Sequence, residues 1–235
     1  SDVCSSDLSI KAGEVVGIAG LIGSGRTELL ECLFGIRQPL SGSISLFGTP
    51  TMVESPAAAT QAGLALVPES RKEQGILADL SIVENANLSR LAAQEHGCVR
   101  NSRTERSLAQ HTVESLKVRC SGLSQLVGRL SGGNQQKVVI GRCLATKPRI
   151  LLLDEPTRGV DVGARREIYS LIFSLAEQGL SVLFVSSELE EVIGISDRVL
   201  VMSEGQIRGE VPRASLSEHT IMSLASPQTK SRVAA

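Results

Sequence analysis

VVGIAGLIGSGRT, residues 15–27, decides the fold, because a short apolar run passes directly into a glycine-rich loop. A helical pattern follows over residues 28–34. In a phosphate-binding loop, which has this strand–loop–helix context, glycines let backbone N–H groups turn toward phosphate oxygens and the helix N-terminus attracts the anion. The stretch therefore predicts a nucleotide phosphate site, although a glycine-rich turn without a ligand has the same pattern when taken alone.

The loop has the spacing G-x-x-x-x-G-[K/R]-T, with Arg26 where a lysine is expected. Arginine keeps the positive charge but presents a wide planar fork instead of a compact ammonium group, so the fit to the β- and γ-phosphates changes. Thr27 still offers a hydroxyl group to Mg²⁺. We expect nucleotide contacts from Gly20, Gly23, Ser24, Gly25, Arg26 and Thr27.

A second stretch, ILLLDEP at residues 150–156, places two carboxylates directly after an apolar run. Asp154 is expected to hold Mg²⁺, and Glu155 is expected to be the catalytic residue that polarises the attacking water. Acidic residues that end a strand are common by themselves. Downstream of a phosphate-binding loop, the pair predicts a metal ligand and a catalytic base.

The third stretch, LSGGNQQK at residues 130–137, begins a helix and again directs a helix N-terminus toward an anion. An ordinary N-cap explains Ser131 but leaves the paired glycines unexplained. At this point the sequence resembles the ATP-binding-cassette (ABC) family of ATPases, whose signature motif is LSGGQ. The resemblance covers about residues 13–210, which is nearly the whole chain.

Four stretches resemble the second, C-terminal cassette of ATPases that energise monosaccharide importers and carry two fused cassettes: LSGGNQQK, VPESRK (67–72), PTRGVDVG (156–163) and SSEL (186–189). The resemblance implies ATP and Mg²⁺ as ligands, a sugar-transporting ATPase (translocase) activity, and a peripheral position on the cytoplasmic face of the inner membrane. The implied partners are the first cassette of the same polypeptide, membrane permease subunits and, indirectly, a periplasmic sugar-binding protein. Ribose, xylose, galactose, arabinose and a related furanosyl signal molecule all remain open as the transported sugar.

In that family two cassettes dock head to tail, so each ATP lies between the loop of one cassette and the signature of the other. The resemblance therefore implies contacts with the partner's ATP from Ser131, Gly132, Gly133 and Gln135. An aspartate introduced at Gly132 is expected to place its carboxylate against the partner's γ-phosphate.

Three departures predict a degenerate site at this chain's own loop. Arg26 replaces lysine, Glu69 stands where the family usually has glutamine, and Ser187 stands where a histidine normally contacts the γ-phosphate. We still expect Glu69 and Ser187 to line the nucleotide site. No aromatic residue precedes Phe34, so the adenine-stacking side chain that the family has upstream of the loop is absent as well.

Composition limits the remaining possibilities. The 235 residues are 42% hydrophobic with a net charge of −1, which suits one buried core and gives no electrostatic reason to expect a nucleic-acid partner. No apolar run approaches the roughly 18 residues of a membrane span. The five cysteines are scattered and never in C-x-x-C spacing, which argues against a disulfide framework or a zinc site.

Alternating apolar runs and helical patterns predict an α/β fold, which the resemblance specifies as a P-loop NTPase of ABC type: a mostly parallel sheet flanked by helices, with a helical signature subdomain. Strands are expected at residues 15–19, 43–47, 64–67, 150–153, 181–185, 199–202 and 206–211. We expect residues 1–7 to be a foreign, adapter-derived segment, 8–225 the nucleotide-binding domain with its helical subdomain at about 76–146, and 226–235 a frayed tail.

Other classes of protein have their own sequence signals. A regulatory or purely structural ATP-binding module would bind nucleotide without turning it over, and only a single-turnover measurement separates it from an enzyme. A cassette acting on nucleic acid in DNA repair would carry a long coiled-coil insertion between Glu69 and Leu130, and none is present. A GTPase is disfavoured because the sequence has no N-K-x-D segment.

Overall fold

The computed structural model describes residues 8–92 and 101–226, without the side chain of Ala92. The predictions for residues 1–7 and for nearly all of the tail, residues 227–235, lie outside these ranges, as do Cys4 and Cys98. The domain boundaries drawn from the sequence stay predictions.

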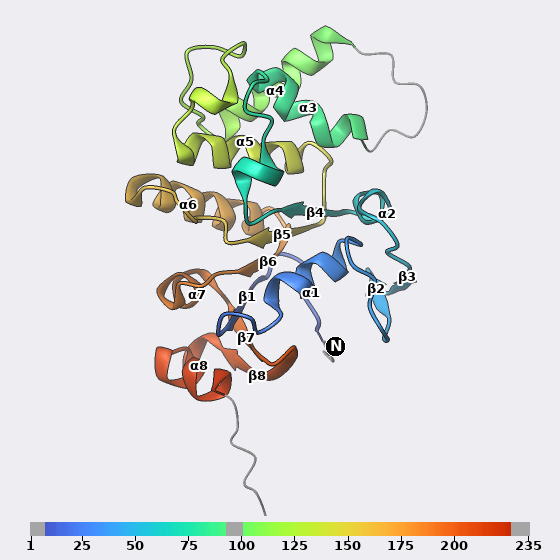
Figure 1. Ribbon diagram of the computed structural model, residues 1–235, viewed down its shortest axis with the longest axis vertical. Coiled ribbons are helices and arrows are strands. Elements are labelled where there is room, and N and C mark those ends of the chain that lie inside the picture. The colour runs from blue at the N-terminus through green and yellow to red at the C-terminus, as the bar shows by residue number, and fades with distance from the viewer. Residues whose placement is uncertain (1–7, 93–100, 227–235) are drawn as a thin grey trace, which may run out of the picture.

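A six-stranded sheet forms the centre of the molecule, with the strand order β4-β5-β6-β1-β7-β8 (Figure 1). Its first five strands in that order are parallel, and β8 pairs with β7 in the antiparallel sense. A separate antiparallel pair, β2 and β3, stands beside this sheet. The strands are β1 (Val15–Gly20), β2 (Ile44–Leu46), β3 (Thr49–Thr51), β4 (Leu64–Val67), β5 (Ile150–Asp154), β6 (Ser181–Val185), β7 (Arg198–Ser203) and β8 (Gln206–Pro212). The mostly parallel sheet expected from the sequence is confirmed.

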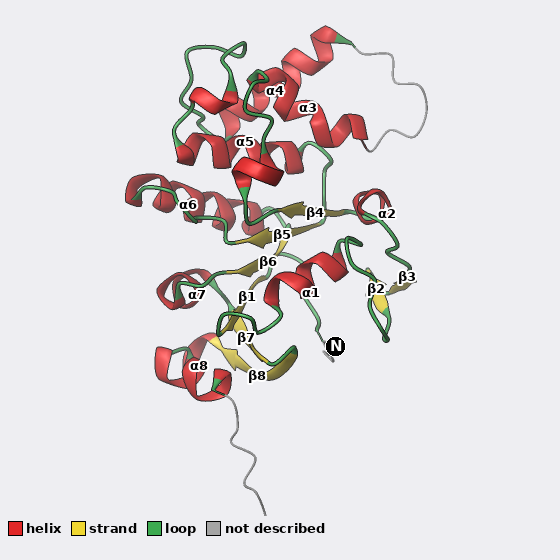
Figure 2. Cartoon of the chain, viewed as in Figure 1, coloured by secondary structure: helices red, strands yellow, loops and turns green. Residues whose placement is uncertain are grey.

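Helices cover both faces of the sheet and one of its ends (Figure 2). The helices are α1 (Arg26–Leu33), α2 (Pro56–Gln61), α3 (Ile82–Ala92), α4 (Ser102–Ser115), α5 (Gly132–Leu144), α6 (Val162–Glu177), α7 (Leu189–Ile195) and α8 (Glu218–Ala225). A π-helical turn at Arg71–Gly75 and 3₁₀ turns at Val127–Arg129 and Arg213–Ser215 complete them. Helices α3, α4 and α5 lie together beyond the β4 edge.

Side chains alternate across the strands, because successive residues of a strand point to opposite faces. Leu151 and Leu153 of β5 belong to a core shared with α5, α6 and α7, whereas Leu152 belongs to a second core shared with α1. Phe184 of β6 is completely buried in the first core and Leu183 in the second. The sheet is therefore buried on both faces, as is typical of parallel strands.

Helix α6 shows how local sequence sets an element's ends. Asp161 is its N-cap, and its carboxylate accepts a hydrogen bond from the Ala164 N–H at 2.9 Å. Ile168 and Ile172 repeat at helical spacing and are buried against the sheet. Gly179 follows the helix with φ of 92°, a left-handed conformation that glycine adopts without steric cost.

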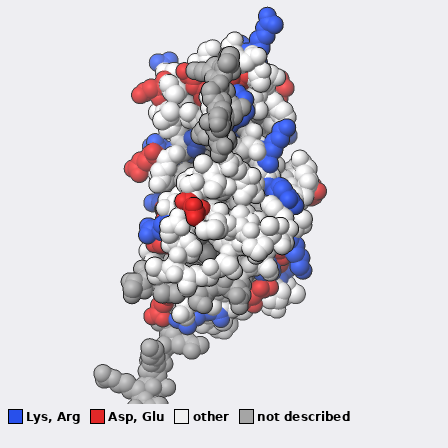
Figure 3. All heavy atoms as spheres, turned by 90° about the vertical axis from the view of Figure 1, so that its right-hand side faces the viewer, with Lys and Arg blue, Asp and Glu red and all other residues white. Residues whose placement is uncertain are grey.

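Charged side chains of both signs lie around one face of the molecule, and the centre of that face is largely uncharged (Figure 3). This distribution offers nucleic acid no continuous basic surface on the face drawn there. Across residues 8–92 and 101–226, no helix combines the length and the apolarity that a bilayer crossing requires.

Candidate functional site

The carboxyl ends of four parallel strands bring the predicted site residues outside the signature to one edge of the sheet. The loop at residues 20–27 follows β1, the acidic pair ends β5, Ser186 and Ser187 follow β6, and Glu69 follows β4. Ligands of open α/β sheets bind at this edge, where connections diverge to opposite faces. Since β1 lies beside β6 and β6 beside β5, the topology places these segments next to one another.

The glycine-rich loop has the backbone that a phosphate cradle needs. Gly25 is the N-cap of α1 with φ of 95°, and Gly23 has φ of 78°, both in the left-handed region. A Cβ atom on Gly20 would lie 2.4 Å from the Met202 carbonyl oxygen, so no side chain fits there. Because α1 begins at Arg26, its first N–H groups have no acceptor within the helix and can meet an anion.

Arg26 is buried, and its side chain points across the site. Its Nη1 donates to the Ser186 carbonyl oxygen at 2.6 Å, joining the loop to the end of β6. A guanidinium group has five N–H donors, so the other donors of Arg26 can still face a phosphate. Arginine in place of lysine therefore adds a hydrogen bond to the protein backbone and keeps the positive charge.

Asp154 combines burial with an unsatisfied oxygen. The residue is 4% exposed, and among the residues that the structure describes its Oδ1 has no hydrogen-bond partner. Burial raises the pKa of Asp154 to about 6, the carboxylates of Glu69 and Glu155 add to the rise, and the Thr27 hydroxyl and Arg26 oppose it. An unpaired carboxylate oxygen beside a threonine hydroxyl fits a divalent cation, which Asp154 and Thr27 would hold together with phosphate oxygens.

Glu155 has an unusual backbone conformation. Its φ is 46°, in the left-handed region, and its N–H donates to the Val185 carbonyl oxygen at 2.9 Å. Such a conformation costs a non-glycine residue about 1–3 kcal/mol and is found mostly at functional sites. The Ser187 hydroxyl donates to Glu155 Oε2 at 3.1 Å, so the predicted general base and the serine in the histidine position are in direct contact.

Glu69 has a partner of its own. Its carboxylate forms an ion pair with Arg158, in the loop that follows the acidic pair. It lies close enough to Asp154 for its charge to raise the pKa of that residue. The structure thus brings Glu69 into the group formed by Arg26, Thr27, Asp154, Glu155 and Ser187.

The signature residues form a second, separate group at the start of α5. Ser131 is exposed, and Gly132 and Gly133 are the first residues of the helix. Among the residues that the structure describes, no hydrogen bond or ion pair joins them to the loop at residues 20–27. A single copy of the chain therefore presents its loop and its signature as two distinct surfaces.

Gln135, for which a contact with a partner's ATP is expected from the resemblance, has hydrogen-bond partners within this chain. Its side chain is 7% exposed, its amide nitrogen donates to the Leu130 carbonyl oxygen at 3.1 Å, and its amide oxygen accepts from Arg71 Nε at 3.3 Å. The amide therefore holds the preceding loop in place, and its contact with a partner's ATP stays a prediction. One turn of helix separates it from the exposed N-terminus, and helix periodicity turns it inward.

Arg71 is a functional candidate that sequence reasoning missed. Its guanidinium donates to the Arg158 carbonyl oxygen at 2.6 Å and to the Gly159 carbonyl oxygen at 3.0 Å, in addition to Gln135. It joins the turn after Glu69, the signature helix and the loop after the acidic pair. These partners lie 64 to 88 residues further along the chain, so no local spacing indicates the contact.

A buried carboxylate, Glu191, was also missed. The side chain is 3% exposed and accepts hydrogen bonds from the hydroxyls of Thr157 at 2.7 Å, of Ser186 and of Tyr169. Burial raises the pKa of Glu191, and the three hydroxyl donors oppose the rise. Through Ser186, this carboxylate supports the segment whose carbonyl oxygen accepts from Arg26.

Comparison with protein families shows a match to the ABC transporter model over residues 4–158. An arabinose import ATP-binding protein, AraG, of Vibrio parahaemolyticus is 49% identical over 93% of this chain and 43% of its own length. AraG of Escherichia coli O6:H1 is 44% identical over 97% of this chain and 45% of its own length. This chain thus spans less than half the length of these curated relatives.

Solved structures have the same fold. The ADP conformation of MJ1267, an ATP-binding cassette of an ABC transporter, superposes with a TM-score of 0.76 at 25% identity, covering 92% of this chain and 89% of that one. A nucleotide-free ATP-binding cassette from an ABC transporter also gives a TM-score of 0.76, at 23% identity, covering 93% of this chain and 90% of that one.

Proposed function

Because this chain belongs to the ABC transporter family of ATP-binding domains, we propose that it binds and hydrolyses ATP to energise the import of a simple sugar. The observation that carries the proposal is the buried, unpaired Oδ1 of Asp154 beside Thr27, at the sheet edge where the glycine-rich loop opens. Arabinose is the first sugar to test, since the curated relatives are named as arabinose import proteins.

The proposed roles follow from the positions of the side chains. The backbone of the loop and the start of α1 would hold the phosphates. The residues concerned are Gly20, Gly23, Ser24, Gly25 and Arg26. Thr27 and Asp154 would hold Mg²⁺, which would supply positive charge to neutralise the phosphates. The Glu155 carboxylate orients the attacking water by accepting its hydrogen bond.

We propose that this site is degenerate. The Ser187 hydroxyl donates a hydrogen bond to Glu155 Oε2 and so competes with water for that oxygen. The Glu69 carboxylate is paired with Arg158. Arg26 is tied to the Ser186 carbonyl oxygen. A regulatory module that binds ATP without hydrolysing it remains the alternative, and single-turnover kinetics at this loop distinguish the two.

The partners are proposed from the separate signature surface. Ser131, Gly132 and Gly133 lie apart from the loop, so in our proposal they complete a site on another cassette, the first cassette of the same full-length polypeptide. Membrane permease subunits and, indirectly, a periplasmic sugar-binding protein would complete the transporter. The chain would then work as a peripheral component at the cytoplasmic face of the inner membrane.

The isolated chain is expected to bind ATP weakly and to turn it over far more slowly than the full-length protein. It lacks both an adenine-stacking aromatic before Phe34 and a partner signature over its own loop. Phosphate release per chain, measured for this fragment and for the full-length protein at saturating Mg·ATP, checks the prediction. Equal turnover by the fragment would contradict the requirement for a partner.

The affinity for Mg·ATP is expected to fall by about tenfold between pH 8 and pH 5. The pKa of Asp154 is about 6, so its carboxyl is ionised at the higher pH and largely neutral at the lower one, where it no longer binds the cation. Nucleotide titrations with and without Mg²⁺ measure the change. Asp154→Asn should remove this component and leave only the titration of ATP itself; an unchanged pH dependence in that variant would refute the assignment.

A further inference from the structure

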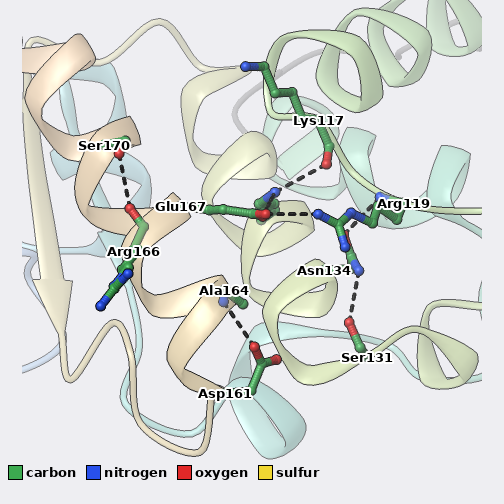
Figure 4. A network of polar contacts seen from close by, with 10 residues as sticks. Lys117, Arg119, Ser131, Asn134, Asp161, Ala164, Arg166, Glu167 and Ser170 are labelled. Carbon is green, nitrogen blue, oxygen red and sulfur yellow. Dashed lines mark hydrogen bonds and ion pairs between the residues drawn. The ribbon is translucent and has the colours of Figure 1, made fainter.

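A polar cleft of about 140 Å³ lies between the starts of α5 and α6, directly beside Ser131. The residues that line it include Arg119, Asn134, Asp161 and Glu167. Figure 4 shows that several of these side chains form a connected network of polar contacts that ends at the Ser131 hydroxyl. Asn134 stands at the fifth position of the signature, where the family motif LSGGQ has glutamine.

The orientation of the Asn134 amide is determined by a group that can only donate. Its Oδ1 accepts a hydrogen bond from the backbone N–H of Arg119 at 2.8 Å. Because that N–H cannot accept, the amide oxygen must face it, and the Nδ2 group must face the other way. Nδ2 donates to Ser131 Oγ at 2.8 Å.

The segment that carries the Arg119 N–H is itself fixed to the helices. Lys137, with a side chain 4% exposed, donates to the Lys117 carbonyl oxygen at 3.1 Å and pairs with Glu167 of α6 at 2.6 Å. The Arg119 guanidinium reaches the same carboxylate at 3.0 Å, but it is 81% exposed, so this outer contact adds little. The buried Lys137 therefore holds the segment whose Arg119 N–H donates to Asn134.

We propose that Asn134 is a positioning residue that fixes the direction in which the Ser131 hydroxyl donates. Since Ser131 Oγ accepts from Nδ2, its own hydrogen points away from Asn134 and toward the exposed side of the helix start. A phosphate oxygen of a partner-bound ATP is the acceptor that this hydrogen serves. The inference rests on the proposed function, in which the signature completes a partner's site.

Two substitutions of Asn134 test the inference in the full-length protein. In Asn134→Asp the carboxylate still accepts from the Arg119 N–H but can no longer donate, so the Ser131 hydroxyl turns to donate to it. Asn134→Leu removes both hydrogen bonds of the amide without adding charge. We expect both to lower kcat for ATP about 10- to 100-fold, the effect of losing one hydrogen bond to a charged group, with KM changed less than kcat.

Thermal unfolding separates positioning from a structural role. A carboxylate in the first turn of α5 interacts favourably with the helix dipole, which offsets repulsion from Asp161 and Glu167, so Asn134→Asp should unfold near the wild-type temperature while its turnover falls. A fall in the unfolding temperature that parallels the loss of turnover would overturn the inference. A loss of turnover in Asn134→Asp together with wild-type turnover in Asn134→Leu would also overturn the inference. Repulsion between the new carboxylate and the phosphate would then explain the effect.

A double-mutant cycle with Ser131→Ala distinguishes failure of the inference from failure of the proposed function. We expect Ser131→Ala to lower turnover as much as Asn134→Leu, and the double variant to be no worse than either single one. Additive losses, or a loss in Ser131→Ala without one in Asn134→Leu, would refute the positioning role. Wild-type turnover in Ser131→Ala would instead refute the proposed function of the signature, and the inference with it.

Discussion

Gly132→Asp is expected to abolish sugar uptake and to lower ATP turnover of the full-length protein about 10²–10³-fold, the effect of losing positioned donors at a reacting phosphate. Glu155→Gln is expected to leave a large part of both activities. The two substitutions affect different sites in our proposal. In that proposal, Gly132 belongs to the signature that would complete the partner's site, and Glu155 belongs to the proposed degenerate site of this chain.

The structure adds a physical reason for the first effect. A Cβ atom on Gly132 would lie 2.7 Å from Arg71 Nη2 and 3.1 Å from the Gly159 carbonyl oxygen. An aspartate side chain there would crowd the Arg71 guanidinium, which donates to the Arg158 and Gly159 carbonyls, and so displace the start of α5. The contact of its carboxylate with the partner's γ-phosphate stays a prediction.

Glu155→Gln has a smaller expected effect because its site already departs from the family pattern. Arg26 is bonded to the Ser186 carbonyl oxygen, and Ser187 occupies the position of the usual histidine and contacts Glu155. The substitution keeps a side chain of the same shape there. In our proposal, the catalytic machinery that limits turnover belongs to the other cassette.

ATP turnover and uptake of labelled sugar, measured for each variant in the reconstituted full-length transporter, test this asymmetry. Gly194→Asp provides the control, because Gly194 is exposed and a Cβ atom there meets no atom within 4 Å. That variant should behave as wild type. If Glu155→Gln were inactive and Gly132→Asp active, the asymmetric-site mechanism would be wrong.

The largest expected effect on folding is that of Glu191→Ala, which should lower the free energy of unfolding by about 3 kcal/mol or more. The carboxylate is buried and accepts from Thr157, Ser186 and Tyr169. Removing it leaves three hydroxyl groups of separate segments without this acceptor and opens a cavity among them. Glu191→Gln, which keeps one acceptor oxygen, should lose less.

Urea unfolding of this chain, followed by circular dichroism, measures the change. The matched control is Glu190→Ala, the same substitution at the adjacent, exposed position, which should change the free energy of unfolding by less than about 0.5 kcal/mol. Equal stability of the two alanine variants would show that the hydroxyl cluster around Glu191 contributes little.

The sequence by itself determined the elements whose causes are local. Strands β4 and β6 have the predicted ends: the apolar run of β4 lies between Gly63 and Pro68, and that of β6 lies between Ser181 and Ser186. The glycine-rich loop follows predicted strand β1, and the acidic pair stands at the end of predicted strand β5. The signature stands at the start of the predicted helix, α5. Strand β3 and helices α2 and α8 were not predicted; β3, for example, is a three-residue Thr-Pro-Thr segment, and proline is rare within strands.

Only the tertiary structure decided which side chains meet. Arg71 contacts residues 64 to 88 positions away, and Glu191 joins two loops and a helix, so no periodicity along the chain predicts either contact. The inward turn of Gln135 and the direction of a Cβ atom on Gly132 depend likewise on how α5 packs against the Arg71 turn. Local patterning sets where a helix begins, whereas the packing of distant segments sets what its first residues face.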